Sequence, residues 1–475
     1  MFEDEEDEWF GADFNKQLET FNQMYENQDY QYLDADQVEI ILDHLLIANQ
    51  FKKAKWAADQ ALKHFPFNNT LLLRKAQAMS LAGELHGAIR ILSKLEKMDA
   101  PNLDLLLTTA ACYSQLRDSD SAIKYFRKAI DFSEGDERTE IYLDLAMEYE
   151  NQKKFRDAIA TLEQALKDDK RNEAIIYELA YCYEQLEDYE NAVKSFLFYI
   201  DEDPYSYTTW YNLGNAYTKM GDVEKALWAY DYCTVINDEF APAYFNMANT
   251  HMDQDDFSKA LTYYKRCLEI DGDDGMVYCS LGECYEEMGE YEKAYESYTK
   301  SADLLPHLGD AWLGKGIISD LMGNFQTAIS ELNVALDLEP DSYNYLRALA
   351  SAYENDGQLE KALETYGKAH ESKESDTDIA LEWMSCLSFV SCDLVAEKFE
   401  STVSLQKNDG AKLAMVYVSW MLGNQSDAIF YFEDVSQSDA SLAKSLFLHF
   451  PELKSNEYFI NRLEELDETD ENEKL

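Results

Sequence analysis

Eight cysteines are the first candidates for chemistry, because thiolates bind metals, form disulfides and act as nucleophiles. Their spacing favours none of these roles. The sequence contains no Cys-x-x-Cys pair, and no two of its seven histidines have the spacing of a metal site. We therefore expect structural cysteines in a reducing compartment, and neither a metal nor a cofactor.

Two short strings resemble ligand-binding loops but lack the residues that such loops need. Asp271–Gly275 reads DGDDG, yet Met276 stands where a calcium loop requires glycine and Gly282 where it requires glutamate. Gly314 and Gly316 flank a lysine without the third glycine of a phosphate loop. No nucleophile is found with a nearby base. The sequence therefore predicts a protein without catalytic activity.

The charge of the chain limits its partners. Its 475 residues include 93 acidic and 41 basic side chains, which give a formal net charge of −52. Nucleic acids and anionic membranes both need basic surfaces, so we expect neither partner. The N-terminus MFEDEEDEWF lacks the features of a secretory signal, and the longest apolar run, Ala414–Leu422, is too short to span a bilayer. We expect an acidic, cytoplasmic protein whose partner, if charge selects it, is basic.

A period of 34 residues runs through the chain. Between Ala146 and Ala350, steps of 34 from Gly214 meet only glycine and alanine, although glycine inside a helix costs about 1 kcal/mol relative to alanine. Such a column indicates that two helix backbones approach closely, with a large residue of one helix above a small residue of the other. A second column is wholly alanine: Ala158, Ala192, Ala226, Ala260, Ala294, Ala328, Ala362 and Ala396.

One repeat shows the complete pattern of large and small residues. It consists of Trp210, Leu213, Gly214, Tyr217, Ala226, Tyr230 and Cys233. This spacing resembles the tetratricopeptide repeat, a helix-turn-helix unit of 34 residues. The resemblance implies an all-α solenoid, a right-handed superhelix of antiparallel helix pairs whose first helices line the concave side. Proteins of this family usually bind extended peptides or partner helices there.

The repeats predict three regions. We expect an acidic N-terminal segment at residues 1–36, an array of about twelve repeats at residues 37–436, clearest at 139–375, and a capping helix pair with an acidic tail at residues 437–475. Between the third and fourth repeats the alanine step is 36, and the two extra residues are assigned to a loop at Ser133–Arg138. The eleventh repeat is degenerate, with Glu400 at an apolar position.

The repeat register also explains most of the cysteines. Cys112, Cys182, Cys284 and Cys386 share a position that alanine fills in other repeats. Cys233 and Cys267 share another small-residue position with Ala165 and Ala335, and only Cys279 and Cys392 fall outside both columns. Buried cysteine behaves as a small apolar residue. We therefore interpret these cysteines as packing residues.

The residues beside the packing columns are the candidate binding residues. Tyrosine and asparagine recur there, and they give a peptide ligand contact area and hydrogen bonds to its backbone. The candidates are Tyr177, Tyr181, Tyr211, Asn212, Asn215, Phe245, Asn246 and Asn249. The asparagines either line a peptide groove or satisfy neighbouring loops. A lysine one turn before the asparagine, which binders of chaperone tails require, is replaced by Tyr211 and Phe245, which disfavours that function.

Further along the array the same face becomes acidic. Glu283 and Glu286 are candidate binding residues there, with Glu287 and Glu354 nearby, and they suit a segment rich in lysine or arginine. After the array, Leu446, Phe447, Phe450, Tyr458, Phe459 and Leu463 either cap the last repeat or form a self-association patch. At the other end, Trp9, Phe10, Phe14 and Phe21 suggest docking of an otherwise mobile acidic segment.

The leading hypothesis is a scaffold or adaptor without catalytic activity that binds peptides or subunits along the concave groove. The alternatives are a structural subunit of a larger stable complex, an accessory protein of an enzyme encoded elsewhere, and an RNA-binding repeat protein. The charge argues against the last of these.

Overall fold

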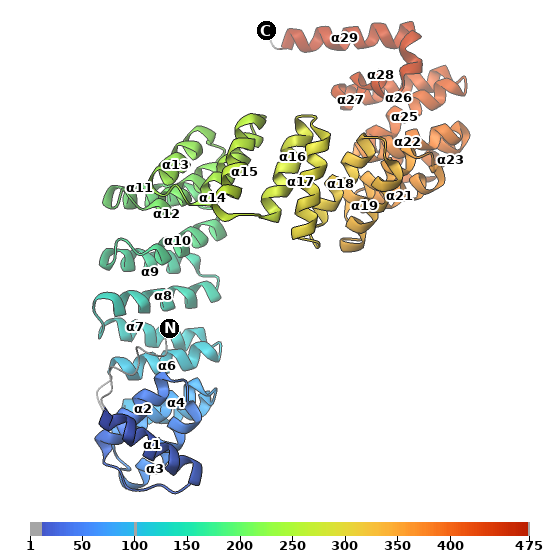
Figure 1. Ribbon diagram of the computed structural model, residues 1–475. Coiled ribbons are helices and arrows are strands. Elements are labelled where there is room, and N and C mark those ends of the chain that lie inside the picture. Colours follow the sequence, from blue (N-terminus) through green and yellow to red (C-terminus); the bar gives the residue numbers. More distant parts are fainter. Residues whose placement is uncertain (1–11, 99–101, 474–475) are drawn as a thin grey trace. The chain divides into compact units, whose positions relative to one another are not determined.

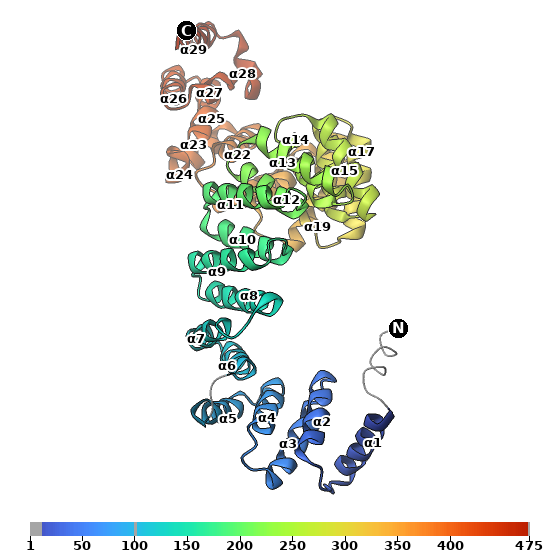
Figure 2. The same cartoon turned by 90° about the vertical axis from the view of Figure 1, so that its left-hand side faces the viewer.

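The computed structural model describes residues 12–98 and 102–473, and within these ranges every regular element is helical (Figure 1). The chain divides into two compact units, Met1–Asp238 and Glu239–Leu475. Within each unit, consecutive helices form antiparallel pairs that stack on one another (Figures 1 and 2). The all-α solenoid of helix pairs is thereby confirmed.

Unit 1 begins with α1 (Ala12–Asn27) and continues with six helix pairs. These pairs are α2 (Ala35–Ile47) with α3 (Phe51–His64), α4 (Asn69–Leu81) with α5 (Leu85–Met98), α6 (Leu103–Gln115) with α7 (Ser119–Ile130), α8 (Gly135–Asn151) with α9 (Phe155–Asp168), α10 (Glu173–Leu186) with α11 (Tyr189–Glu202), and α12 (Tyr207–Lys219) with α13 (Val223–Ile236).

Unit 2 contains six further pairs and a C-terminal group of helices. The pairs are α14 (Ala241–Met252) with α15 (Phe257–Asp271), α16 (Gly275–Glu287) with α17 (Tyr291–Leu304), α18 (Gly309–Leu321) with α19 (Phe325–Leu338), α20 (Tyr343–Asn355) with α21 (Leu359–Ser372), α22 (Thr377–Val390) with α23 (Cys392–Ser401), and α25 (Asp409–Met421) with α26 (Gln425–Ser438). The remaining helices are α24 (Val403–Gln406), α27 (Ala440–Lys444), α28 (Leu446–His449), the 3-10 helix η2 (Pro451–Ser455) and α29 (Glu457–Glu473).

The glycine column packs as its sequence predicts. A Cβ atom on Gly214 would lie 2.4 Å from the ring of Tyr230, and one on Gly282 would lie 2.6 Å from the ring of Tyr298. Such distances are far inside van der Waals contact, so only a hydrogen atom fits beneath each ring. The glycine cost in helix propensity is thus offset by close packing between the two helices of a pair.

The alanine column is fully or almost fully buried from Ala54 to Ala362, but Ala396 departs from it. A single residue, Ser391, separates α22 from α23, whereas other pairs are joined by a turn that contains a left-handed residue. The shorter turn shifts the register of α23 by one residue, so Val395 and Phe399 are buried while Ala396 is half-exposed and Glu400 is exposed. The assignment of Ala396 and Glu400 to the core columns was therefore wrong.

The two extra residues of the fourth repeat were expected in a loop at Ser133–Arg138, but the structure has a helix over most of that range. The loop covers only residues 131–134, because α8 begins at Gly135 and is longer than the other first helices. Arg138 therefore lies in a helix, where its Nε is 2.8 Å from Oδ2 of Asp168. The segments between α5 and α6 (99–102) and between α9 and α10 (169–172) have the same length as this loop, so the insertion lengthens the helix α8 and not the loop.

Both described ends of the array are covered by apolar contacts. Phe14 and Phe21 of α1 are buried, and the ring of Phe21 lies 5.9 Å from that of Trp56 on α3. Trp9 and Phe10 lie outside the described residues. At the other end Phe459 of α29 is fully buried, with its ring 5.1 Å from that of Phe432. Leu446, Phe450 and Phe459 thus belong to the same buried cluster as the last helix pair, whereas Tyr458 is exposed, and the capping role stays a prediction.

Candidate functional site

The first helices of several neighbouring pairs contact each other directly within each unit. In unit 1, α2 contacts α4, α4 contacts α6 and α10 contacts α12, and in unit 2, α16 contacts α18 and α18 contacts α20. The second helices of neighbouring pairs have no comparable contact in the described residues. The first helices therefore lie on the inner side of the curve of each unit (Figures 1 and 2). We call this side the first-helix face.

The first-helix face of unit 1 exposes large apolar side chains. The exposed fractions are 53% for Met147 of α8, 42% for Tyr177 and 46% for Tyr181 of α10. The ring of Phe155 supports Tyr181 in an edge contact at 6.2 Å. Tyr211 on α12 is half-buried on the same face. Apolar side chains clustered on one face mark interaction surfaces more often than scattered ones do.

The asparagines differ in their availability to a ligand. Asn212 is 6% exposed and donates to the carbonyl of Thr208 in its own helix at 3.0 Å, so its amide faces the interior. The amide oxygen of Asn215 accepts a hydrogen bond from the Tyr230 hydroxyl at 2.8 Å. Asn249 accepts from Tyr264 in the same way at 2.6 Å. A buried tyrosine thus fixes the orientation of the amide at this register.

The candidates on α14 lie at the start of unit 2. Phe245 and Asn246 are half-buried, and the Phe245 ring lies 5.7 Å from that of Tyr264. Tyr177, Tyr181, Tyr211 and Asn215 belong to unit 1, whereas Phe245, Asn246 and Asn249 belong to unit 2. A single groove formed by both groups therefore stays a prediction.

Acidic side chains replace the amides further along unit 2. The Tyr298 hydroxyl donates to Oε2 of Glu286 at 2.7 Å, and the Tyr366 hydroxyl donates to Oε2 of Glu354 at 2.9 Å. Partial removal from water raises the pKa of Glu286 and, with the nearby Asp310 and Glu286 carboxylates, the pKa of Glu283. The charges on this face are therefore incompletely neutralised.

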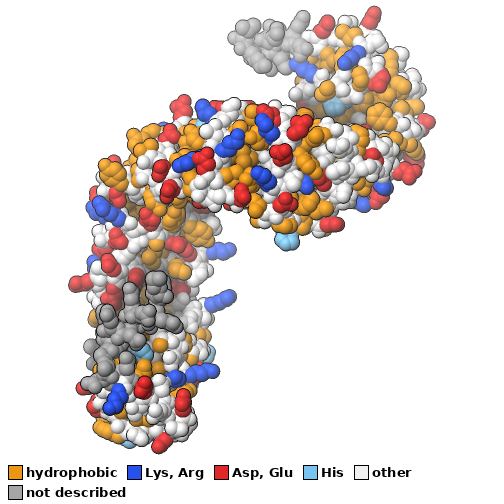
Figure 3. All heavy atoms as spheres, viewed as in Figure 1, with side chains coloured by type: hydrophobic (Ala, Val, Ile, Leu, Met, Phe, Trp, Pro, Cys, Tyr) orange, Lys and Arg blue, Asp and Glu red, His pale blue; other side chains and the backbone are white. Residues whose placement is uncertain are grey.

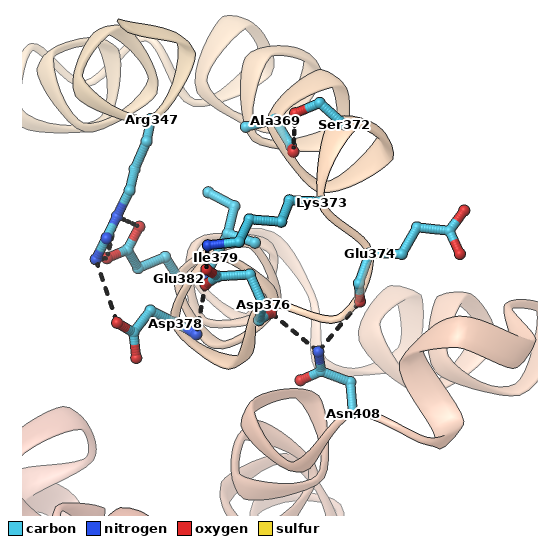
Figure 4. A network of polar contacts seen from close by, with 10 residues as sticks. All are labelled: Arg347, Ala369, Ser372, Lys373, Glu374, Asp376, Asp378, Ile379, Glu382 and Asn408. Atoms are coloured by element: carbon cyan, nitrogen blue, oxygen red, sulfur yellow. Dashed lines mark hydrogen bonds and ion pairs between the residues drawn. The ribbon is translucent and has the colours of Figure 1, made fainter. Parts of the chain in front are cut away.

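The two basic residues on α16, α18 and α20 already have acidic neighbours. Lys315 is buried, with its Nζ 3.5 Å from Glu331 Oε1. Arg347 lies between Glu382 and Asp378 of α22, and its Nε donates to Glu382 Oε2 at 3.0 Å (Figure 4). Neither side chain contacts Glu283 or Glu286 through an ion pair in the described residues. A cationic ligand would supply the missing positive charge.

The network in Figure 4 also fixes the spacing of the later repeats. Asn408 donates to the backbone oxygens of Glu374 at 3.3 Å and Asp376 at 2.9 Å, and so ties the start of α25 to the turn before α22. The side chain of Asp376 accepts from the backbone N–H of Ile379 at 3.2 Å, which caps α22. A Cβ atom on Gly410 would lie 1.8 Å from the Thr377 carbonyl oxygen. These contacts hold α22 and α25 directly together.

The cysteines are packing residues in the structure. Seven of the eight are buried and Cys392 is half-buried. Burial raises the pKa of the Cys233 and Cys386 thiols to about 12, which keeps them protonated and weakly nucleophilic at neutral pH. Among the described residues, no group of histidine, cysteine and acidic side chains is arranged to hold a metal ion. Nor does any described helix combine the length and apolarity that a bilayer crossing requires.

Comparison with known families identifies the architecture. Models of the tetratricopeptide repeat match residues 239–307, residues 143–207 and 322–377, and residues 104–136 and 207–233. Together these segments exceed half of the chain. The chain belongs to the tetratricopeptide repeat family. Tetratricopeptide repeats support a role in protein interaction in general, which agrees with the exposed first-helix face.

Several solved structures are similar to this chain at low sequence identity and with TM-scores below 0.5. A chain of the APC/C hetero-tetramer Cut9–Hcn1 is 13% identical, and the match covers 87% of this chain and 96% of that chain with a TM-score of 0.42. Pseudomonas aeruginosa pilF is 15% identical, and the match covers 53% of this chain and 97% of that chain with a TM-score of 0.38. YrrB, described as a TPR protein with an unusual peptide-binding site, is 19% identical, and the match covers 38% of this chain and 93% of that chain with a TM-score of 0.34. No curated protein matched the chain.

Sequence reasoning missed two features of these repeats. Met147 occupies the register of Tyr181 one repeat earlier, so the same step of 34 residues would have placed it on the first-helix face. The hydrogen bonds from buried tyrosines to Asn215, Asn249 and Glu286 join two helices of one pair, and the spacing of the columns alone does not show them.

Proposed function

We propose that this protein is a scaffold without catalytic activity that binds peptides or partner subunits along its first-helix faces. The observation that carries the proposal is the exposure of Met147, Tyr177 and Tyr181 on adjacent first helices. Tyrosine anchors lose little conformational entropy on binding and often dominate interface energy. Asn215, whose oxygen is held by Tyr230, lies in the register of Tyr181 one repeat later.

The first-helix face of unit 2 suits a different ligand chemistry. Glu283 and Glu286 carry raised pKa values, and the basic residues of the neighbouring first helices are engaged elsewhere. A lysine- or arginine-rich segment would relieve the repulsion between these carboxylates. We therefore propose a basic partner for unit 2. Acidic and basic side chains are interspersed on the face seen in Figure 3, without a large basic area that would favour nucleic acid.

Affinity capture with matched variants tests the scaffold. Tyr177→Ser with Tyr181→Ser removes two exposed rings, and we expect bound partners to fall by about tenfold in quantitative mass spectrometry. Tyr205→Ser is the control, because Tyr205 is equally large, is 79% exposed and lies between α11 and α12 rather than on a first helix. Circular dichroism checks that each variant keeps its helicity.

The same measurement separates the scaffold from a structural subunit. A stable complex gives partners in fixed stoichiometry that survive the double tyrosine change, whereas an adaptor gives partners that depend on it. Asn215→Ala with Asn249→Ala tests the amides, and Glu283→Lys with Glu286→Lys tests the basic partner. Partner lists that match the parent in all three variants would refute binding on the first-helix faces.

A further inference from the structure

A groove opens on the second-helix side of unit 1, between α9 and α11. Its volume is about 820 Å³, within the range of ligand-binding cavities. The apolar side chains lining it come from three helices: Ile159 and Leu166 of α9, Tyr183 and Leu186 of α10, and Phe198 and Tyr199 of α11. Phe198 is 60% exposed and stands at the mouth. We call this feature the α9–α11 groove.

The groove has a cause in the repeat register. Tyr199 occupies the small-residue position that Ala165 fills one repeat earlier and Cys233 one repeat later. The separation of two packed helices depends on the side chains at their contact. A tyrosine at this position needs more room, and α10 and α11 are accordingly in much less contact than α12 and α13. Tyr199 thus holds the fifth pair open.

The rim of the groove is positively charged, in contrast to the chain as a whole. Arg156, Lys167 and Lys194 are exposed, and in the described residues no carboxylate lies within ion-pair distance of them. Of the acidic side chains, only Glu202 has a cationic partner, Lys170. Asp188 and Glu163 accept hydrogen bonds from neutral donors, the amide of Asn191 at 2.9 Å and the hydroxyl of Tyr183 at 3.5 Å, and keep their charge. Four basic and three acidic side chains line the groove, so one positive charge is left over.

We propose that the α9–α11 groove binds an acidic segment of a partner protein that carries a large apolar side chain. The apolar side chain enters between Tyr183, Phe198 and Tyr199, and the flanking carboxylates meet Arg156, Lys167 and Lys194. These three basic side chains of the groove lie on the second helices α9 and α11, and the groove shares none of its lining residues with the candidate residues of the first-helix faces. A short acidic segment can stay within reach of these three basic side chains, whereas a long polyanion such as RNA extends beyond them and is repelled by the net charge of −52.

Fluorescence anisotropy with the full chain tests the groove. The probe is a fluorescein-labelled octapeptide, EDEWFEDE, which supplies carboxylates and two aromatic anchors. We expect saturable binding that weakens when salt rises from 50 to 300 mM, because screening shortens the range of the rim charges. Replacing Trp and Phe of the probe by alanine should abolish saturation at the concentrations used, since the floor of the groove is apolar.

A matched pair of charge reversals locates the binding site. Lys194→Glu together with Lys167→Glu should weaken probe binding by about tenfold. The control is Lys124→Glu, because Lys124 is exposed on α7 at the register of Lys194 and outside the groove. Affinity unchanged in the double variant, or lost equally in the control, would overturn the proposal. Loss of binding in the tyrosine variants of the first-helix face alone would also overturn it, by placing the probe there.

Two further outcomes would assign the groove to another occupant. If analytical ultracentrifugation shows a dimer of the parent that Lys194→Glu abolishes, the occupant is a second copy of this chain. If a single-stranded RNA 12-mer displaces the probe at lower concentration than unlabelled EDEWFEDE does, the ligand is a nucleic acid. Either result contradicts an acidic protein segment as the occupant.

Discussion

The fifth and sixth helix pairs have the same register but pack differently. In α12–α13 the small residues Gly214 and Cys233 let the helices approach, and Tyr230 lies directly over the glycine. In α10–α11 Ala180 and Tyr199 occupy those two positions, the helices are in less contact, and a groove of about 820 Å³ adjoins them. The comparison shows that the small-residue columns set the spacing of each pair. A single exception to them creates a surface feature.

The largest expected effect comes from filling the close contact of α12–α13. Gly214→Leu forces a side chain into the Tyr230 ring, and we expect it to lower the free energy of unfolding by about 3 kcal/mol. Ala180→Leu in the splayed fifth pair should cost clearly less, because α11 is further away. Urea denaturation followed by circular dichroism measures both. Equal costs would mean that the two pairs do not differ in packing.

Removing the bulky residue of the fifth pair should have an intermediate effect. Tyr199→Ala lets α11 move toward α10, so we expect a loss of about 1 kcal/mol and a weaker affinity for the acidic probe. Phe196→Ala on the same helix is the control, because Phe196 is fully buried and its removal should cost about 3 kcal/mol. If Tyr199→Ala costs as much as Phe196→Ala, the helices do not close and Tyr199 does not hold the groove open.

A smaller effect is expected on the first-helix face of unit 2. Glu283 stands there at the position that the amide of Asn215 occupies in the sixth pair. The folded-state pKa of Glu283 is raised, so its contribution to stability is present below the ordinary glutamate value of about 4.3 and is lost as pH rises through the folded-state value. Glu283→Gln should therefore raise Tm at pH 7 and leave it nearly unchanged at pH 4.

Glu364→Gln is a control for Glu283→Gln with the same change in net charge. The hydrogen bond from Lys368, and the charge of that lysine, lower the pKa of the exposed Glu364, so its substitution should not raise Tm at pH 7. Calorimetry at both pH values measures the difference. Equal increases in Tm for the two variants would attribute the effect to net charge rather than to the acidic face.

The smallest effect concerns thiol reactivity at the position that Tyr199 occupies in the fifth pair and Cys233 in the sixth. Burial raises the pKa of Cys233 to about 12, so iodoacetamide at pH 7.5 should modify it slowly, after the half-buried Cys392. A Tyr199→Cys variant places a thiol at the same register in the splayed pair, and that thiol should react faster than Cys233. Peptide mapping by mass spectrometry compares the two rates in one sample.

The sequence was sufficient to predict the repeats because their packing is periodic. Gly214, Tyr230 and the buried alanines follow a strict step, and each faces the same kind of neighbour. The prediction that Ala396 is buried was wrong because a single residue separates α22 from α23. The short turn rotates α23, but an alanine still stands at the expected step in the sequence, so the sequence pattern does not reveal the rotation. A sequence period predicts which residue of a helix is buried only when the turn before that helix has the same length as in the other repeats.

The candidate binding residues were less predictable than the fold. The exposure of Tyr177 and Tyr181 follows from their place beside the packing columns. Asn212 is buried instead, and its amide donates a hydrogen bond to the carbonyl of Thr208 in its own helix. The helical spacing of the asparagines does not show whether each amide faces the interior or the solvent. The α9–α11 groove was missed because Tyr199 was not compared with the small residues of its own column.

The turns between paired helices carry a further consequence. Six pairs of unit 1 turn through a left-handed residue, which is glycine at Gly83 and Gly221 but Asn49, Arg117, Lys153 and Glu187 in the other four. In unit 2 the only such turn without glycine in the described residues is at Asp255. A left-handed residue with a side chain costs roughly 1 kcal/mol. Under a pulling force we therefore expect unit 1 to unravel before unit 2, which gives the array a built-in order of mechanical failure.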